Sequence, residues 1–320
     1  MKILITGIGG AIGSHVAEAL LLRGDQVVGI DNLDPYYNPR IKQLNLSDVK
    51  AKGGVVVIGD INAHDFTGFG DDVDAIVHFA AQPGISAGTQ FGHYVQNNIS
   101  ATHALLTHAL TLPKLSAFVH ISTSSVYGAS ARGSEESVPK PTSPYGVTKL
   151  AAEQLALSKY RSDKLPVTVL RLFSVFGPRE RPEKLYHKLI HAMKTGNTFP
   201  LHEGSEKHLR SFTYISDIVD ATIRALDRID KVQGEIINIG SRELRTTGEG
   251  IAIIERIIGE KAPLIKSPPR YGDQKETEAI IDKAQLLLDF TPKVSLEEGL
   301  HAQYKWHIER LLPHLESEEE

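Results

Sequence analysis

Six short, almost wholly apolar runs recur in the first 172 residues of this chain, and helical patterns separate them. Strands covered by helices on both faces of a parallel sheet show such continuous runs, whereas strands with one face in water alternate. Right-handed β-α-β crossovers join strands of this kind, so the pattern predicts an α/β fold with a doubly wound parallel sheet. The expected strands are 2–6, 26–30, 55–59, 75–80, 117–122 and 167–172, and the expected helices are 11–23, about 92–112 and about 144–164.

The second half of the chain is less regular. Pro178, Pro182 and Pro200 interrupt the pattern there, because proline cannot continue a helix or a central strand. We expect helices in this half near 183–195, 216–229, 248–258, 282–289 and 295–311.

These two patterns predict two domains and a tail. The first is a Rossmann-like domain over 1–172, and the second is a smaller substrate-binding domain mainly over 173–315. The run EIINIG at 235–240 resembles a buried strand, so a segment near 212–240 is expected to return to the first sheet. The last residues, 316–320, form an acidic tail.

The composition narrows the possible partners. The 320 residues carry a net charge of −4, which gives no reason to expect a nucleic-acid partner or an anionic membrane surface. Positive charge is instead local, in PRERP and HLRSF, and suits small anionic ligands. The chain has no cysteine, hence no thiol nucleophile or thiolate-bound metal. It starts on a strand pattern and has no apolar run of about 18 residues, so we expect a cytoplasmic enzyme.

The first expected strand ends in a glycine-rich turn, ITGIGGAIGSH. Gly7, Gly10 and Gly13 give the spacing GxxGxxG, and Ile12 stands where GxGxxG would need its third glycine. Between a first strand and a first helix, such glycines let the backbone approach a pyrophosphate at the helix N-terminus. Asp31 ends the second strand, where a carboxylate suits the ribose hydroxyls of NAD and would repel the 2′-phosphate of NADP.

Two further residues follow the third expected strand. Asp60 and Ile61 are candidates to contact the adenine of the dinucleotide, with an ordinary loop aspartate as the alternative interpretation.

A YxxxK pair provides a candidate general base. Tyr145 and Lys149 are four residues apart, so on a helix they share a face. An ammonium beside a phenol lowers the phenol pKa and makes tyrosine a usable base near neutral pH. The same spacing recurs at 160–164 and 271–275, but only the first pair opens a helix after the fifth strand. We interpret the other two as surface pairs.

Taken together, these motifs resemble the extended short-chain dehydrogenases/reductases, in the branch of nucleotide-sugar epimerases and dehydratases. The resemblance covers about 300 residues in order. It rests on TGxxGxxG at 6–13, Asp31 in GIDNL, HFAA at 78–81, STSSVYG at 122–128, YGVTK at 145–149, FSVFGPRERP at 173–182, RSFTYISDIVD at 210–220 and RYGD at 270–273.

The resemblance implies a catalytic trio of Thr123, Tyr145 and Lys149, with Thr123 sharing a hydrogen bond with the sugar 4-OH. The 4,6-dehydratases and decarboxylases of the family carry a glutamate just after this threonine. Here those places hold Ser124 and Ser125, and a hydroxyl cannot move the C5 proton as a carboxylate can. The resemblance therefore implies oxidation at C4 followed by reduction, which is 4-epimerisation.

The sugar end favours a carboxylated substrate. GPRERP is similar to the motif of UDP-glucuronate 4-epimerases, which implies that Ser174 and Arg181 hold the C6 carboxylate; a surface salt bridge is the alternative for Arg181. Ser86 stands where those enzymes often have an arginine, and this keeps UDP-glucose or UDP-galactose open. Thr277 replaces a bulky residue of some members, which keeps 2-acetamido sugars open as well.

The remaining assignments follow from the same resemblance. Arg210 and Arg270 match the arginines that bind the diphosphate, and Asp273 would hold a ribose or orient Arg270. Asn98 matches an asparagine that supports the active-site backbone. The expected substrate contacts are Thr123, Ser124, Ser174, Arg181, Arg210, Arg270 and Asp273. The expected NAD contacts are Gly7, Gly10, Ile12, Gly13, Asp31, Asn32, Asp60, Ile61, Ala80, Ala81, Asn98, Tyr145 and Lys149.

No metal is expected. His187 and His191 are four residues apart on an expected helix, but no third ligand accompanies them in the sequence. The helices near 92–112 and 144–164 are the pairing surfaces of this family, which implies a homodimer.

The sequence thus predicts an NAD-dependent UDP-sugar 4-epimerase that acts on UDP-glucuronate. Two other classes stay open at this point. A ketosugar reductase would consume NADH with each turnover, and a scaffold that only binds NAD would turn over no nucleotide sugar.

Overall fold

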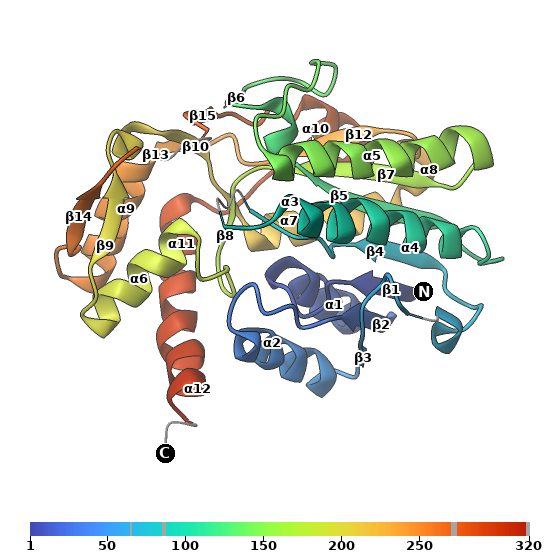
Figure 1. The fold of residues 1–320 in the computed structure, drawn as a ribbon, viewed down its shortest axis with the longest axis horizontal. Helices are drawn as coiled ribbons and strands as arrows, with labels where there is room; N and C mark the ends of the chain where they lie inside the picture. The colour runs from blue at the N-terminus through green and yellow to red at the C-terminus, as the bar shows by residue number, and fades with distance from the viewer. Residues whose placement is uncertain (65, 85–87, 270–273, 318–320) are drawn as a thin grey trace.

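The computed structural model describes residues 1–320 except 65, 85–87, 270–273 and 318–320. At its centre lies a parallel sheet in the order β12-β7-β5-β4-β1-β2-β3 (Figure 1). The chain leaves β1 in one direction to β2 and β3 and in the other to β4, which confirms the doubly wound α/β fold. The strands are β1 (Lys2–Thr6), β2 (Gln26–Asp31), β3 (Val55–Ile58), β4 (Ala75–His78), β5 (Ala117–Thr123), β7 (Val167–Leu172) and β12 (Ile236–Ile239).

The predicted apolar runs all become strands of this sheet, with ends that shift by at most two residues. The run at 235–240 becomes β12 and pairs in parallel with β7, with Ile237 opposite Leu170. The strands are continuous apolar runs because helices cover both faces.

Two apolar cores lie on the two faces of the sheet. One is packed under helices α1 (Ala11–Arg23), α7 (Ile215–Asp227) and α10 (Asp282–Leu288). The other lies under α4 (Ala101–Ala109) and α5 (Pro144–Asp163). Helices from both halves of the chain therefore stabilise the same sheet, and the division into domains at residue 172 stays a prediction.

Helix α2 (Pro39–Ala51) was not predicted. Asn38 caps it by accepting a hydrogen bond from the Arg40 N–H, and proline stands in its first turn. Its buried face includes Lys42 and Asn45 beside leucines, so the apolar stripe that reveals most helices is interrupted.

The single helix expected near 92–112 is divided in three. A short helix α3 (Phe91–Tyr94) leads into a π-helical stretch η2 (Val95–Ser100) and then into α4. Such stretches often occur at functional sites, and this one carries Asn98.

The region after β7 builds a smaller core from α6 (Leu185–Thr195), α9 (Thr247–Ile258) and α11 (Leu296–Trp306). Tyr186 and Leu300 are among its buried side chains. The strands around it are short: β8 (Val175–Phe176), β9 (Phe199–His202), β10 (Leu209–Ser211), β11 (Thr213–Tyr214), β13 (Leu244–Thr246), β14 (Leu264–Ser267) and β15 (Glu276–Thr277), while β6 (Ser130–Ala131) reaches β15 from the first half.

The C-terminal segment returns to the first half. After α11 the chain continues through η5 (His307–Leu311) and α12 (Leu312–Glu316) alongside α2 (Figure 1). Arg40 donates to the carbonyls of His314 and Leu315. Among the residues that the structure describes, no helix combines the length and apolar character needed to cross a bilayer.

Candidate active site

A cavity of about 410 Å³ opens at the carboxyl ends of the sheet strands. It lies where the chain order reverses between β1 and β4, the place where open parallel sheets bind ligands. Its wall combines the turn after β1, the ends of β2, β4 and β5, the start of α5 and the loop after β7. The residues predicted from the sequence that line it are Gly7, Gly10, Ile12, Gly13, Asp31, Asn32, Asp60, Ile61, Ala80, Ala81, Thr123, Ser124, Tyr145, Lys149, Ser174 and Arg181.

The glycine turn packs so closely against the neighbouring backbone that it has no space for side chains at Gly7 and Gly13. Gly7 has φ +69°, and a Cβ on it would lie 2.8 Å from the Ala80 nitrogen. A Cβ on Gly13 would lie 2.4 Å from the Gly7 carbonyl oxygen, so this glycine sets how closely α1 approaches the turn. Gly10 is the N-cap of α1, whose first residues line the cavity where their N–H groups suit a pyrophosphate.

Asp31 is held in place at the end of β2. It is 6% exposed, and its carboxylate accepts hydrogen bonds from the N–H groups of Gly9 at 3.0 Å and Leu33 at 2.9 Å. A carboxylate has about four acceptor positions, so capacity remains for ribose hydroxyls. Lys42 on α2 approaches Asp31 Oδ1 to 3.3 Å and lines the same cavity. Lys42 was missed because nothing in the sequence places α2 beside β2.

The turn after β3 holds the other candidates for the adenine end. Asp60 accepts hydrogen bonds from the backbone N–H and side-chain amide of Asn62, at 2.8 and 2.9 Å. Both interpretations of Asp60 therefore find support, since it orders its own loop and also lines the cavity with Ile61.

Tyr145, Lys149 and Thr123 all line the cavity. Tyr145 and Lys149 lie on the first turns of α5, where Ser143 caps the helix by accepting from the Gly146 N–H at 3.1 Å. Thr123 is the last residue of β5, and its hydroxyl shares a hydrogen bond with the Tyr145 phenol.

Burial and nearby charge act in opposite directions on this pair. Burial raises the pKa of Tyr145, while the Arg181 charge and the Thr123 hydrogen bond lower it. Burial lowers the pKa of Lys149 to about 8, and the Glu153 carboxylate opposes this shift. Lys149 therefore titrates close to the neutral range.

The hydroxyls at 122–125 divide between two directions. Ser122 lines the cavity, but its hydroxyl donates at 2.9 Å to Oε2 of Glu153, a buried carboxylate outside the cavity wall. Thr123 accepts from the Ser125 N–H at 3.2 Å and so caps the short turn η3 (Ser124–Tyr127). Ser124 and Ser125 line the cavity. The cavity wall beside Thr123 therefore carries hydroxyl groups at the positions where a dehydratase would need a carboxylate.

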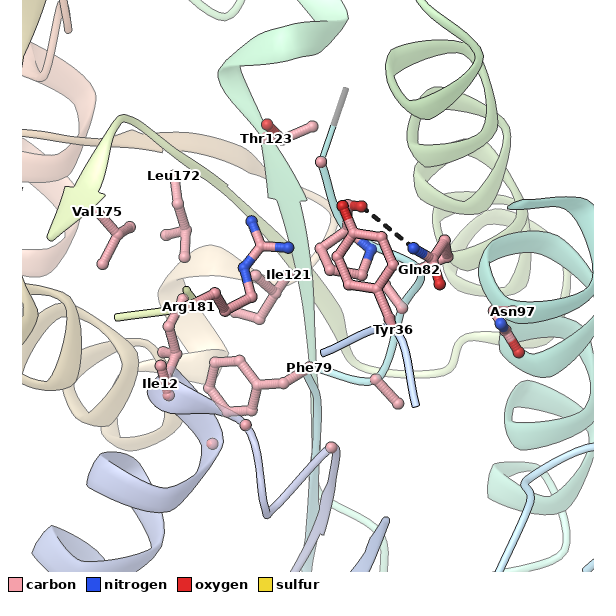
Figure 2. A pocket seen from close by; sticks show the side chains of 18 of the residues that line it. Ile12, Tyr36, Phe79, Gln82, Asn97, Ile121, Thr123, Leu172, Val175 and Arg181 are labelled. Carbon is pink, nitrogen blue, oxygen red and sulfur yellow. Dashed lines mark hydrogen bonds between the residues drawn. The ribbon is translucent and has the colours of Figure 1, made fainter. Parts of the chain in front are cut away.

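The loop after β7 brings Arg181 into the cavity. Figure 2 shows its guanidinium among the labelled side chains, in front of the strand that carries Ile121 and Thr123. Arg181 Nη1 lies 2.8 Å from Glu183 Oε1. Both sequence interpretations of Arg181 thus meet in one place, because it forms a salt bridge and also faces the cavity.

Ser174 has an unusual backbone conformation in the same loop, with φ +31°. Its hydroxyl lies 3.4 Å from that of Thr277 on β15. Non-glycine residues rarely adopt positive φ, and such strain is concentrated at functional sites.

The expected diphosphate clamp is only partly visible. Arg270 and Asp273 lie outside the described residues, as does Ser86. Arg210 donates to the Leu209 carbonyl at 3.1 Å and to the Gln274 carbonyl, and in the described part of the chain it lies outside the cavity wall. The clamp therefore stays a prediction.

Asn98 does not lie on the cavity wall, contrary to its assignment as an NAD contact. It is buried, and its Oδ1 accepts from the Gln82 N–H at 2.7 Å while its Nδ2 donates to Thr148 Oγ1 at 2.9 Å. It joins the loop after β4 to α5, so it supports the backbone that the resemblance implied.

A third histidine joins His187 and His191. His307 on η5 lies with its Nε2 3.3 Å from His191 Nδ1. Within the described ranges, no group of three histidine, cysteine or acidic residues has an arrangement that would hold a metal ion.

Fold and site together define a dinucleotide-binding enzyme of the tyrosine–lysine type. The family model described as "NAD dependent epimerase/dehydratase family" matches residues 3–240, and the chain belongs to this family.

Three relatives illustrate the similarity. A Bacillus subtilis protein named "Uncharacterized UDP-glucose epimerase YtcB" is 37% identical over 308 residues, 94% of this chain and 96% of the relative. "UDP-glucuronate 4-epimerase 5" of Arabidopsis thaliana is 34% identical over 96% of this chain and 76% of its own length. The crystal structure of the Bacillus cereus UDP-glucuronic acid 4-epimerase with UDP-glucuronic acid and NAD is 39% identical, with TM-score 0.91 and coverage of 96% and 98%.

Proposed function

We propose that this protein is an NAD-dependent UDP-sugar 4-epimerase that interconverts UDP-glucuronate and UDP-galacturonate. The observation that carries the proposal is the meeting of Tyr145, its Thr123 hydrogen bond and the Arg181 guanidinium in one cavity. Tyr145 and Thr123 together can move a proton to or from a hydroxyl group, and the Arg181 guanidinium can bind a carboxylate.

The cavity suits NAD because the glycine turn at the start of α1 lines it, where a pyrophosphate would bind, and because Asp31 lines it as an acceptor for ribose hydroxyls. NAD bound there would accept the C4 hydride and return it. The glycine turn would hold the pyrophosphate, and Lys149 would bind the nicotinamide ribose.

The protein residues move the proton. Tyr145 removes the 4-OH proton as the C4–H bond breaks, and Thr123 steadies the shared hydrogen bond. Lys149 in its cationic form favours the phenolate. The 4-keto sugar then turns about its diphosphate linkage, and Tyr145 returns the proton to O4 on the opposite configuration at C4. No net redox change results.

The choice of sugar rests on Arg181 and Ser174. An arginine held in a partly dry cavity favours a C6 carboxylate over a neutral hydroxymethyl group. UDP-glucose is the second candidate, and the name of the Bacillus subtilis relative, a UDP-glucose epimerase, favours it.

Proton NMR of the purified protein with UDP-glucuronate, and separately with UDP-glucose, tests both candidates. A galacturonate anomeric signal from the first sugar alone supports the proposal. Conversion of UDP-glucose alone would assign the second function. A stoichiometric change in NADH absorbance would instead identify a net oxidoreductase, and no turnover of any nucleotide sugar would leave a binding scaffold.

A homodimer is part of the proposal, and the cytoplasmic location stays a prediction. Three large apolar side chains are exposed on the segments expected to pair: Phe91 on α3 at 57%, Leu110 just after α4 at 40% and Val147 on α5 at 46%. Light scattering should give twice the chain mass. Val147→Glu should yield a monomer, whereas Leu286→Glu, at an 81% exposed leucine of α10, should leave the dimer intact. A monomeric wild type would contradict the proposal.

A further inference from the structure

A buried ion pair lies behind the cavity wall, next to the lining residue Ser122. Glu153 on α5 is fully buried and Arg171 on β7 is 1% exposed. The Arg171 guanidinium donates two hydrogen bonds to the Glu153 carboxylate, Nη2 to Oε1 at 2.6 Å and Nε to Oε2 at 3.0 Å. Buried ion pairs seldom stabilise a fold more than apolar side chains of similar volume would. Stability alone therefore does not account for this pair.

Glu153 connects the two elements that carry the proposed catalytic residues. Its Oε2 also accepts the hydrogen bond from Ser122, the neighbour of Thr123 on β5. The Ser122–Glu153 bond joins α5 to β5, and the Thr123–Tyr145 bond joins the same two elements. The first bond thus fixes the separation that the second one needs.

Glu153 also lies one helical turn from Lys149, on the same face of α5. Lys149 is 4% exposed, so its charge is costly without an anion nearby. The other titratable groups that act on it from the sheet are His78 on β4 and His120 on β5, and burial holds the pKa of both imidazoles low enough to keep them neutral. The Arg171 charge is paired with Glu153 itself.

We propose that Glu153 is a positioning residue for the 4-epimerase reaction. Through Ser122 and Arg171 it fixes α5 against β5, and its carboxylate keeps Lys149 cationic one turn away. The inference deepens the proposed function and rests on it where turnover is concerned. The effect of Glu153 on the charge of Lys149 can be measured without any sugar.

The test is the titration of Lys149 in NAD-saturated protein, followed by ¹³C NMR of Cε in ¹³C-lysine-labelled samples and assigned with Lys149→Met. Glu153→Gln removes the charge and retains the shape. We expect the Lys149 pKa to fall by about one pH unit and the alkaline limb of the kcat profile to move to lower pH with it. Tyr127→Phe is the matched control, because it removes another buried hydrogen bond to Arg171, 2.8 Å long, without changing a charge. It should leave both titrations in place.

Glu153→Gln leaves a buried guanidinium without its anion and has a risk of misfolding. The double variant Glu153→Gln with Arg171→Met removes both charges and should show a smaller fall in the Lys149 pKa than Glu153→Gln, because no unpaired guanidinium remains nearby. An unchanged Lys149 titration in either folded variant overturns the inference, as does an equal shift in Tyr127→Phe.

The two proposals fail separately. If wild-type protein epimerises UDP-glucuronate and Glu153→Gln titrates like wild type, only the inference fails. If wild type turns over no sugar while the Lys149 pKa still falls in Glu153→Gln, the proposed function fails and the link between Glu153 and Lys149 stands.

Discussion

The two sides of the cavity are built differently. On the dinucleotide side, Gly7 follows β1 and Asp31 ends β2, the neighbouring strand, and backbone hydrogen bonds hold both: Gly7 donates to the Ile30 carbonyl, and Asp31 accepts from the Gly9 N–H. On the sugar side, Ser174 and Arg181 come from a loop in which three residues have positive φ: Ser174, Gly177 and Arg179. Regular elements thus hold one side, and strained loop backbone holds the other.

Ion pairs hold the sugar-side loop against the first half. Arg179 is buried, and its Nη2 lies 2.6 Å from Glu18 on α1 and 2.8 Å from Asp48 on α2. Asp48 also pairs with Arg310 on η5 at 2.7 Å. The sheet itself therefore fixes the cofactor side, whereas the side proposed to select the sugar depends on a few side-chain contacts made by a long loop.

The largest effect is expected at Tyr145, which the proposed mechanism places between the cofactor and the sugar. Tyr145→Phe removes the general base, so turnover should fall by about 10³-fold or more, in the upper range of general acid–base contributions. NAD binding should persist because the strand ends that hold it are untouched. Turnover by NMR and NAD affinity by calorimetry check the two parts. Turnover within tenfold of wild type would remove Tyr145 from its role.

The next effect tests how rigid the dinucleotide side is. Gly7→Ala places a methyl group against the Ala80 backbone at a positive φ, so we expect a loss of about 3 kcal/mol in unfolding free energy together with weak NAD binding. Gly24→Ala is the matched control, since Gly24 also has a positive φ, +96°, but nothing lies within 4 Å of its Cβ position. It should cost about 1 kcal/mol and leave NAD binding alone. Equal losses of unfolding free energy in the two variants would mean that the turn after β1 can move. The dinucleotide side would then be no more rigid than the sugar side.

A smaller effect belongs to the sugar side. Arg181→Leu should lower kcat/KM for UDP-glucuronate by about 30-fold, or ~2 kcal/mol, the usual range for one charge-assisted hydrogen bond. Inhibition by UDP, which carries no sugar carboxylate, should not change. Steady-state kinetics with UDP as a competitor separates the two. A parallel loss of UDP affinity would show that Arg181 acts on the whole loop rather than on the carboxylate.

The fold was predictable because its signals are local. Each buried parallel strand is a continuous apolar run, and the glycine turn has its spacing within a few residues. The pair Tyr145 and Lys149 is likewise contained in one helical turn, so the sequence alone places both on one face of α5.

The missed features depend on contacts between distant segments. Lys42 reaches Asp31 only because α2 packs beside β2, and its buried polar face hides that helix from an apolar pattern. Glu153 lies on α5 and Arg171 lies on β7, and nothing in the sequence indicates that these two side chains pair. Asn98 was assigned to the cofactor from resemblance, whereas its bonds to Gln82 and Thr148 make it a brace behind the wall.

Burying Lys149 on the dinucleotide side also has a cost in unfolding free energy. Burial lowers the pKa of Lys149 from 10.5 to about 8, so at neutral pH the folded protein holds a charged ammonium that water would solvate better. Lys149→Met should therefore raise the unfolding free energy at pH 7 by up to about 3 kcal/mol, since the shift from 10.5 to about 8 already includes the attraction to Glu153. The unfolded state binds more protons than the folded state between pH 8 and 10.5. The stability of the wild type should thus rise over that window, and the advantage of the variant should vanish by its upper end. Urea denaturation at pH 7, 8, 9 and 10.5 measures this. A variant that is less stable than wild type at pH 7 would mean that Lys149 is a structural contact, and that the dinucleotide side keeps its lysine at no cost in stability.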